Sequence, residues 1–406
     1  MSTDISGTTD ISWIRLAITA RYPDIIKDKG ADLDNNGQID KNETFSDLNG
    51  NVTIDDKDFW IYLEKNRTLI ATQIEFFKYQ GENISDNNII NHLLLIESQM
   101  YKKEAVQKAY EKINLIIATM KEKLINTKKP EALLKSAYQT LQDDFSIRIE
   151  DPNDALFINN LLRGILDCDT STFLFLAIAH ECNWPLFAVS APQHVFMRWD
   201  DGKTTFNFDH GYILSNKYYQ TWLNIDENSI KDGVYLKKLS ESEITGQLYF
   251  NRGIAERELC DDQGAVEDFN EALRLFPKNA DILNNRGIVK NELGDLKGAF
   301  DDYNEALRLD PNNSPTYNNR GIANDALANH KGASGDFKGA IDDHKKAIDD
   351  YTKALRLAPK FTEAYFNRGI TRDKLGDNKG AQEDFNEAIR LDPQLKKRLN
   401  NSRYAH

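Results

Sequence analysis

The sequence is poor in cysteine: its 406 residues include three, Cys168, Cys182 and Cys260. Three cysteines are too few for a disulfide framework, so the composition favours reduced thiols and a cytoplasmic location. No apolar run approaches the roughly 18 residues of a membrane-spanning helix. The N-terminal residues also lack a basic start followed by an apolar core, which argues against a secretion signal.

Positive charge is scarce as well, since 51 Lys and Arg face 64 Asp and Glu and leave a net charge of −13. Such an acidic chain is not expected to bind nucleic acid or an anionic membrane. Hydrophobic residues make up 40% of the chain and aromatic residues 10%, which suits folded protein rather than disorder. Its length predicts two or three domains.

Cys168 opens an apolar stretch that reads as a helix. Residues of the types found in a first helical turn follow it at 169–172, and Asn183 and Pro185 are expected to end the helix. A thiol at a helix N-terminus lies at the positive end of the helix dipole. The position therefore favours the thiolate, the nucleophilic form of cysteine.

Two strand-like runs, 194–199 and 204–209, follow this helix and are joined through an Asp-Gly pair. If Asp201 and Gly202 form a two-residue turn, Trp199 pairs with Thr204 and His194 lies directly opposite Asp209. Opposed residues have Cβ atoms about 5 Å apart, within reach of an imidazole–carboxylate hydrogen bond. The same register assigns Phe196, Arg198, Thr205 and Asn207 to the His194 face, and Val195, Met197, Phe206 and Phe208 to a core.

These residues resemble the transglutaminase-like, papain-related superfamily. The resemblance lies in Cys-Asp-x-Ser/Thr at the helix start, in His-x-Phe-x-Arg-Trp, and in an acid fifteen residues after the histidine. It implies Cys168 as nucleophile, His194 as general base and Asp209 as the group that fixes the histidine tautomer. The implied reaction is acyl transfer by a peptidase, deamidase or transglutaminase. The alternative is that these are structural residues of a catalytically inactive scaffold.

Near the N-terminus, residues 32–43 resemble an EF-hand calcium loop, with glycine at the sharp turn and oxygen donors at alternate positions. Its ligands would be Asp32, Asp34, Asn36, Gln38, Asp40 and Glu43. The sequence therefore predicts Ca²⁺ as a cofactor. An Asx-rich loop without metal is the alternative.

A second loop at residues 47–58 follows the same spacing less closely. Its ligands would be Asp47, Asn49, Asn51, Thr53, Asp55 and Asp58. Val52 replaces the usual glycine, and Asp58 replaces glutamate as in dockerin-type loops. Calcium would brace this segment or gate the cysteine site. A further alternative is a calcium-responsive adaptor, in which the N-terminal segment changes the affinity of the repeats for a partner.

The last third of the chain is repetitive. Asn-Arg-Gly recurs at Asn251, Asn285, Asn319 and Asn367, with intervals of 34, 34 and 48 residues. From about 246 to 395 it resembles the tetratricopeptide repeat, two antiparallel helices per unit stacked into a superhelix. The long interval adds 14 residues to the third unit, in two seven-residue steps that keep the apolar stripe in phase.

Tetratricopeptide arrays present a concave groove for a protein or peptide partner, although packing onto the preceding domain is the alternative. Isoleucine occupies the expected groove position of each unit: Ile254, Ile288, Ile322 and Ile370. The repeated asparagines are expected to contact a ligand backbone or to join neighbouring helices.

The predicted fold class is therefore multidomain α+β. A helical segment with calcium loops (1–80) precedes a transglutaminase-like domain (81–243), in which a new helix starts at Pro130. A tetratricopeptide superhelix with a polar cap (244–406) completes the chain.

Overall fold

The computed structural model describes residues 45–46, 53–54, 94, 96–98, 100–150 and 156–395. Its contacts divide the chain into two compact units, Met1–Asp86 with Leu94–Lys108, and Asn87–Leu93 with Ala109–His406. In the first unit, strands β1 (Phe45–Ser46) and β2 (Thr53–Ile54) pair antiparallel, so Thr53 lies in a strand. The other predicted calcium ligands lie outside the described residues, and the calcium sites stay predictions.

The second unit contains most of α4 (Lys103–Leu124) and all of α5 (Pro130–Phe145). Pro130 occupies the first turn of α5, where its missing N–H costs nothing, so the predicted helix start is confirmed. Next come β3 (Arg148–Ile149), α6 (Phe157–Arg163) and β4 (Ile165–Leu166), with β3 and β4 paired in parallel. This short ladder leads the chain to Cys168.

Helix α7 (Cys168–Cys182) begins at the cysteine, as predicted. Its N-cap is Asp167, whose carboxylate accepts the Thr170 N–H at 2.7 Å, while the Thr170 hydroxyl reaches back to the Asp167 N–H. Asn183 ends the helix in the left-handed conformation, with φ of 55°. Two hydrogen bonds of this capping box hold Cys168 at the first helical position.

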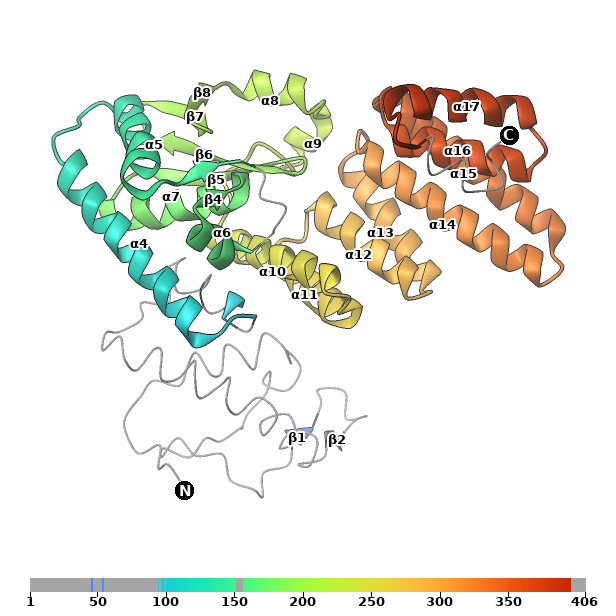
Figure 1. Ribbon diagram of the computed structural model, residues 1–406, viewed down its shortest axis with the longest axis horizontal. Coiled ribbons are helices and arrows are strands. Elements are labelled where there is room, and N and C mark those ends of the chain that lie inside the picture. The colour runs from blue at the N-terminus through green and yellow to red at the C-terminus, as the bar shows by residue number, and fades with distance from the viewer. Residues whose placement is uncertain are drawn as a thin grey trace. The chain divides into compact units, whose positions relative to one another are not determined.

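A four-stranded antiparallel sheet follows, in the order β5–β6–β7–β8. Its strands are β5 (Leu186–Ala191), β6 (His194–Asp200), β7 (Thr205–Asp209) and β8 (Tyr212–Leu214). Helix α7 packs on β5 and β6, and Figure 1 shows it along one face of the sheet. Val195, Met197 and Phe208 are buried as predicted, with the Phe175 and Phe208 ring centroids 6.1 Å apart.

The predicted hairpin register is wrong by two residues. Asp200 pairs with Thr205 and Trp199 with Phe206, so Asp201–Thr204 is a four-residue loop. The Asp201 carboxylate accepts the N–H groups of Lys203 (2.8 Å) and Thr204 (2.6 Å), which stabilises the longer loop. Because side chains alternate with a period of two, this shift leaves every residue on its predicted face.

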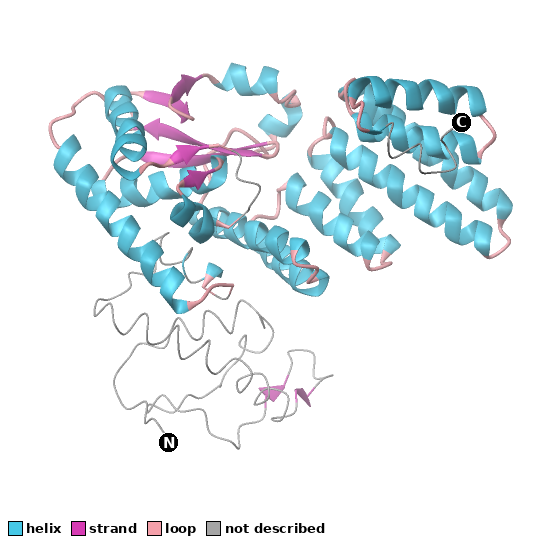
Figure 2. Ribbon diagram, viewed as in Figure 1, coloured by secondary structure: helices cyan, strands magenta, loops and turns pink. Residues whose placement is uncertain are grey.

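Helices α8 (Asn216–Trp222) and α9 (Glu227–Lys231) connect the sheet to four helical hairpins (Figure 2). The hairpin helices are α10 (Glu241–Glu258), α11 (Asp262–Leu275), α12 (Ala280–Glu292), α13 (Leu296–Leu309), α14 (Ser314–Ala333), α15 (Phe337–Leu357), α16 (Thr362–Lys374) and α17 (Asn378–Leu391). The third hairpin has helices of 20 and 21 residues, so the predicted lengthening is confirmed.

The repeated Asn-Arg-Gly motif has a packing explanation. Each glycine faces an aromatic ring of its own hairpin, and an added Cβ would lie 2.6–2.7 Å from a ring carbon. The four pairs are Gly253–Phe269, Gly287–Tyr303, Gly321–Tyr351 and Gly369–Phe385. Each arginine pairs with an aspartate on the second helix of the hairpin, as Arg286 does with Asp302. The motif therefore closes each hairpin.

The asparagines of the motif serve two purposes. Asn319 and Asn367 donate to Asn284 and Asn318 of the preceding repeat, at 3.0 and 3.1 Å, and so join neighbouring hairpins. Asn251 and Asn285 belong to the first two hairpins and line a cavity.

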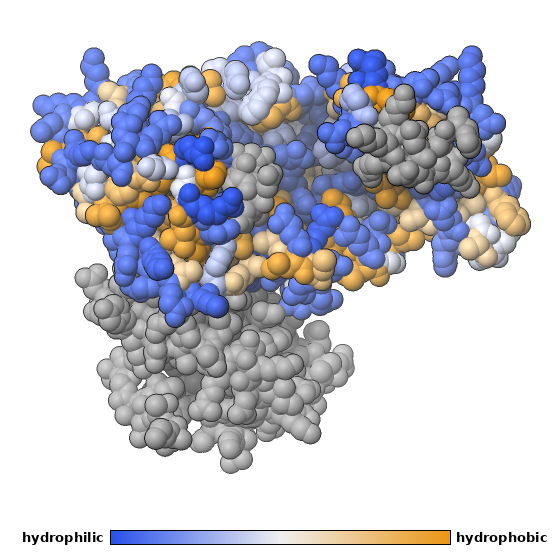
Figure 3. Space-filling model, in the orientation of Figure 1, coloured by the Kyte–Doolittle hydropathy of each residue, from blue (hydrophilic) through white to orange (hydrophobic). Residues whose placement is uncertain are grey.

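The second hairpin shares a hydrophobic core with the sheet, and Leu273 of the first hairpin packs against that core. Val189 and Phe196 of the strands belong to one buried cluster with Ala280, Leu283 and Leu309 of the repeats. None of the described helices is long and apolar enough to cross a membrane. On the face shown in Figure 3, hydrophobic residues form separate groups among hydrophilic ones.

Candidate functional site

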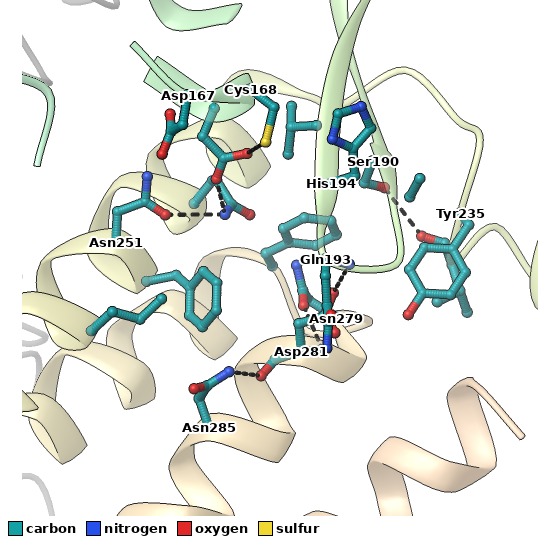
Figure 4. Close-up of a pocket in the computed structure, with 18 residues that line it drawn as sticks. Asp167, Cys168, Ser190, Gln193, His194, Tyr235, Asn251, Asn279, Asp281 and Asn285 are labelled. Atoms are coloured by element: carbon teal, nitrogen blue, oxygen red, sulfur yellow. Dashed lines mark hydrogen bonds between the residues drawn. The ribbon is translucent and has the colours of Figure 1, made fainter. Parts of the chain in front are cut away.

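Residues of the sheet region and of the first two repeats line a common cavity of about 280 Å³ (Figure 4). The N-terminus of α7 contributes Asp167, Cys168 and Asp169, and β6 contributes His194. The repeats contribute Gln247, Phe250, Asn251, Ile254, Phe276, Asn279, Asp281 and Asn285. Cys168 and His194 therefore face the same space, together with residues of the first two repeats.

Asp209 fixes the orientation of His194 by a hydrogen bond. Its Oδ2 accepts hydrogen bonds from the His194 ring at Nε2 (2.7 Å) and from the Tyr219 hydroxyl (3.0 Å). The Tyr219 ring stacks on Phe196 with centroids 3.9 Å apart, and its side chain is fully buried. With the observed register, His194 and Asp209 are diagonal rather than direct neighbours, and the imidazole spans the difference.

The charge of Asp209 is stabilised on both oxygens, since His210 Nδ1 contacts Oδ1 at 2.6 Å. Burial would raise the pKa of Asp209, but the hydrogen bonds with His194 and His210 outweigh it and hold that pKa well below its ordinary value. The bond to Asp209 raises the pKa of His210. Asp209 is thus a carboxylate that orients His194 through Nε2. The other ring nitrogen of His194, Nδ1, is not bonded to Asp209.

The environment of Cys168 differs from the sequence prediction. The Val195 backbone lies close enough to the sulfur to lower the pKa of the thiol slightly, which places Cys168 beside the start of β6. The thiol itself donates to Asp169 Oδ1 at 3.4 Å. Burial, followed by the charges of Asp169 and Asp167, raises the pKa of Cys168 well above its ordinary value. The expectation of a favoured thiolate is therefore wrong, because burial and two neighbouring carboxylates disfavour the charged form of Cys168.

Sequence reasoning missed the residues that the repeats bring to this cavity. Gln247 Nε2 donates to Asp169 Oδ2 at 2.9 Å and to Asn251 Oδ1 at 3.2 Å. Asp281 Oδ2 accepts the N–H of Gln193 at 2.8 Å, in the turn before His194, where Gln193 has a φ of 52°. The repeated motif drew attention to Asn251 and Asn285. Nothing in the spacing indicated Gln247 or Asp281.

Burial of Asp281 gives a testable pH dependence. Burial, opposed by the Gln193 N–H, raises the pKa of Asp281 to about 7. The folded state therefore holds this proton more tightly than the unfolded chain, and the contribution of Asp281 to stability increases as the pH falls from 8 to 5. Asp281→Asn should remove about 2–3 kcal/mol of that increase, because the amide stays neutral throughout.

Urea unfolding at both pH values measures the difference. The exposed control Asp301→Asn should retain it, and an Asp281→Asn variant with the wild-type increase would contradict the assignment.

Comparison with known families identifies the C-terminal region. Models described as Tetratricopeptide repeat match residues 246–279, 280–313, 332–361 and 362–395. The chain therefore carries tetratricopeptide repeats where the sequence predicted them, a class of repeat that binds protein partners. The matched family segments start at residue 246, after Cys168, His194 and Asp209 in the chain. No curated protein matches the chain.

Solved structures similar to this chain include other tetratricopeptide proteins. A thermophilic one, TTC0263 of Thermus thermophilus, is 20% identical over 38% of this chain and 80% of its own, with a TM-score of 0.35. A MamA double mutant (RS-1 ArsTM) is 23% identical over 37% and 76%, with a TM-score of 0.30. The Arabidopsis OM64 TPR domain is 24% identical over 33% and 98%, with a TM-score of 0.29.

Proposed function

We propose that this chain is a protein-binding scaffold whose repeat groove presents a partner segment to the Cys168 cavity. The observation that supports the proposal is that one cavity is lined both by repeat residues, Asn251, Ile254 and Asn285, and by Cys168 and His194. A segment bound along the first two repeats would thus place a side chain or a backbone carbonyl beside the thiol.

The lining of the cavity indicates the chemistry of that segment. Its polar side chains are mainly amides and carboxylates, among them Asp167, Asp169 and Asp281, and no Lys or Arg is among the described lining residues. Amides pair with peptide N–H and C=O groups, and carboxylates favour a cation. Phe250, Ile254 and Phe276 supply apolar surface. The site suits an extended peptide that carries a basic side chain.

Peptides selected from a random display library on the full chain test this proposal. We expect the selected peptides to be rich in Lys and Arg, and Asn285→Ala to weaken their binding about 5- to 30-fold through loss of hydrogen bonds in a desolvated site. Fluorescence anisotropy measures the affinities. Asn386→Ala changes an exposed residue of α17 and serves as the matched control. Selected peptides that bind both variants as tightly as wild type would place the binding surface elsewhere.

A second candidate function is cysteine-dependent acyl transfer on the bound segment. It is favoured by the Tyr219–Asp209–His194 hydrogen bonds, which fix a base at the cavity that holds Cys168. In the reaction, the sulfur would attack a carboxamide or peptide carbonyl while its proton passes to His194 Nδ1. His194 would return that proton to the departing amine or ammonia. Water or an amine would then release the thioester, as in a peptidase or deamidase, or in a transglutaminase.

The raised pKa of Cys168 constrains this second function. A resting thiol must lose its proton to His194 during the attack, rather than standing ready as a thiolate. The backbone N–H of Cys168 would be the first donor to the developing oxyanion. We also keep as proposals a cytoplasmic location and Ca²⁺ binding by the two N-terminal loops, both of which rest on the sequence alone.

A further inference from the structure

A continuous hydrogen-bonded chain connects the repeat groove to the thiol. Asn251, from the Asn-Arg-Gly motif of the first repeat, accepts from Gln247, which donates also to Asp169, which accepts from Cys168. Asn251 and Gln247 lie one turn apart on α10, whereas Asp169 and Cys168 belong to α7. All four residues line the cavity (Figure 4).

We propose that the repeat array controls the reactivity of Cys168 through Gln247, which holds the Asp169 carboxylate against the thiol. Gln247 is a positioning residue in this proposal, because it acts on the sulfur through Asp169. Its side chain is 5% exposed, and its amide nitrogen lies 2.9 Å from Asp169 Oδ2. That donor stabilises the charged form of the carboxylate, and a carboxylate beside the sulfur disfavours the thiolate.

The surroundings of the thiol support this direction of effect. The titratable side chains that line the cavity with Cys168 are Asp167, Asp169, His194, Tyr235 and Asp281. Burial and Asp167 raise the pKa of Asp169 to about 6, and the Cys168 hydrogen bond, the nearby His194 and the Gln247 donor oppose that rise. Without the donor, Asp169 takes up a proton at a higher pH. The thiol then loses a negative neighbour in the neutral range and ionises more readily.

The test is the rate at which iodoacetamide alkylates Cys168 between pH 5 and 9, followed by peptide mass spectrometry on the full chain. Asp169→Asn should raise the rate at pH 7 about 3- to 10-fold, since the thiolate fraction grows tenfold for each unit by which the thiol pKa falls. Gln247→Met keeps the side-chain size, removes the donor and should shift the profile in the same direction. Cys182 and Cys260 in the same digest report general changes in accessibility.

The double variant decides whether Gln247 acts through Asp169. If it does, Asp169→Asn with Gln247→Met should match Asp169→Asn alone within about twofold. The proposal would be overturned if the rate increase in the double variant equalled the product of the two single increases. It would also be overturned if Gln247→Met left the pH profile of Cys168 alkylation unchanged. Glu241→Gln removes an exposed charge from the same helix and should leave the profile unchanged.

This inference concerns the cavity of the proposed function but does not depend on that function's success. Alkylation needs neither a bound peptide nor an acyl donor. Failure of peptide selection or of acyl transfer would therefore leave the Gln247 result intact, and the reverse also holds. Where a variant unfolds, its circular dichroism spectrum shows it, and Asp169→Asn then still tests the link from carboxylate to thiol.

Discussion

His194→Ala is expected to slow the acylation of Cys168 by a small activated thioester about 10²–10⁴-fold, the usual contribution of a positioned general base. The effect should be this large because the thiol is protonated in the resting state and because Asp209 and Tyr219 fix the imidazole at the cavity. The rate is measured as the mass gain of the Cys168 peptide when the acyl group replaces the thiol proton.

His210→Ala is the matched control for this experiment. His210 contacts the other oxygen of Asp209 at 2.6 Å but does not line the cavity. We expect it to change the rate less than about 10-fold, through the charge of Asp209 alone. Equal rates in wild type and His194→Ala would show that the histidine is structural, and would leave partner binding as the function of the chain.

Arg252→Met is expected to destabilise the folded chain by about 3–5 kcal/mol, because it leaves a buried carboxylate without its partner. Arg252 donates from Nε and from one terminal nitrogen to Asp268, each at 2.5 Å, and both residues are 5% exposed. Glu256 lies nearby, and burial followed by Asp268 raises its pKa to about 8. Removal of the guanidinium therefore leaves two acidic groups in a buried site.

Urea unfolding followed by circular dichroism measures this loss. The control is Arg308→Met, since Arg308 pairs with Glu305 at the surface, where both side chains are more than two-fifths exposed. Ion pairs between exposed side chains contribute little to stability, so Arg308→Met should have a small effect. A similar small loss in Arg252→Met would show that the buried pair adds little stability. The contact between the motif glycine and the aromatic ring would then be the main contribution of the motif to hairpin packing.

Local sequence determined several elements of the site. The residues around Cys168 favour a helix start, and Asn183 tolerates the left-handed conformation that ends the helix. Alternation along the strands assigned His194, Arg198 and Asn207 to one face, and the Arg198–Asn207 hydrogen bond of 2.8 Å agrees with it. These features depend on residues close in sequence. They were therefore predicted correctly even though the predicted hairpin register was wrong by two residues.

The repeats could also be predicted from the sequence, because each hairpin is closed by contacts within its own unit. Glycine against an aromatic ring and arginine against aspartate recur at nearly constant spacing, and so leave a periodic signature. The hairpin register was harder to predict from the sequence. Hydrogen bonds to the Asp201 side chain set the loop length, and the rule for two-residue turns does not include them.

Only the tertiary structure decided the state of the thiol and the composition of the cavity. The dipole of α7 is a local property, but burial of Cys168 and the fixed position of Asp169 depend on packing. Gln247 and Asp281 lie more than 70 residues from their partners, Asp169 and Gln193. No periodicity connects such positions. Long-range packing of the first two repeats on the sheet brings them together, and a sequence pattern records only contacts that recur at regular spacing.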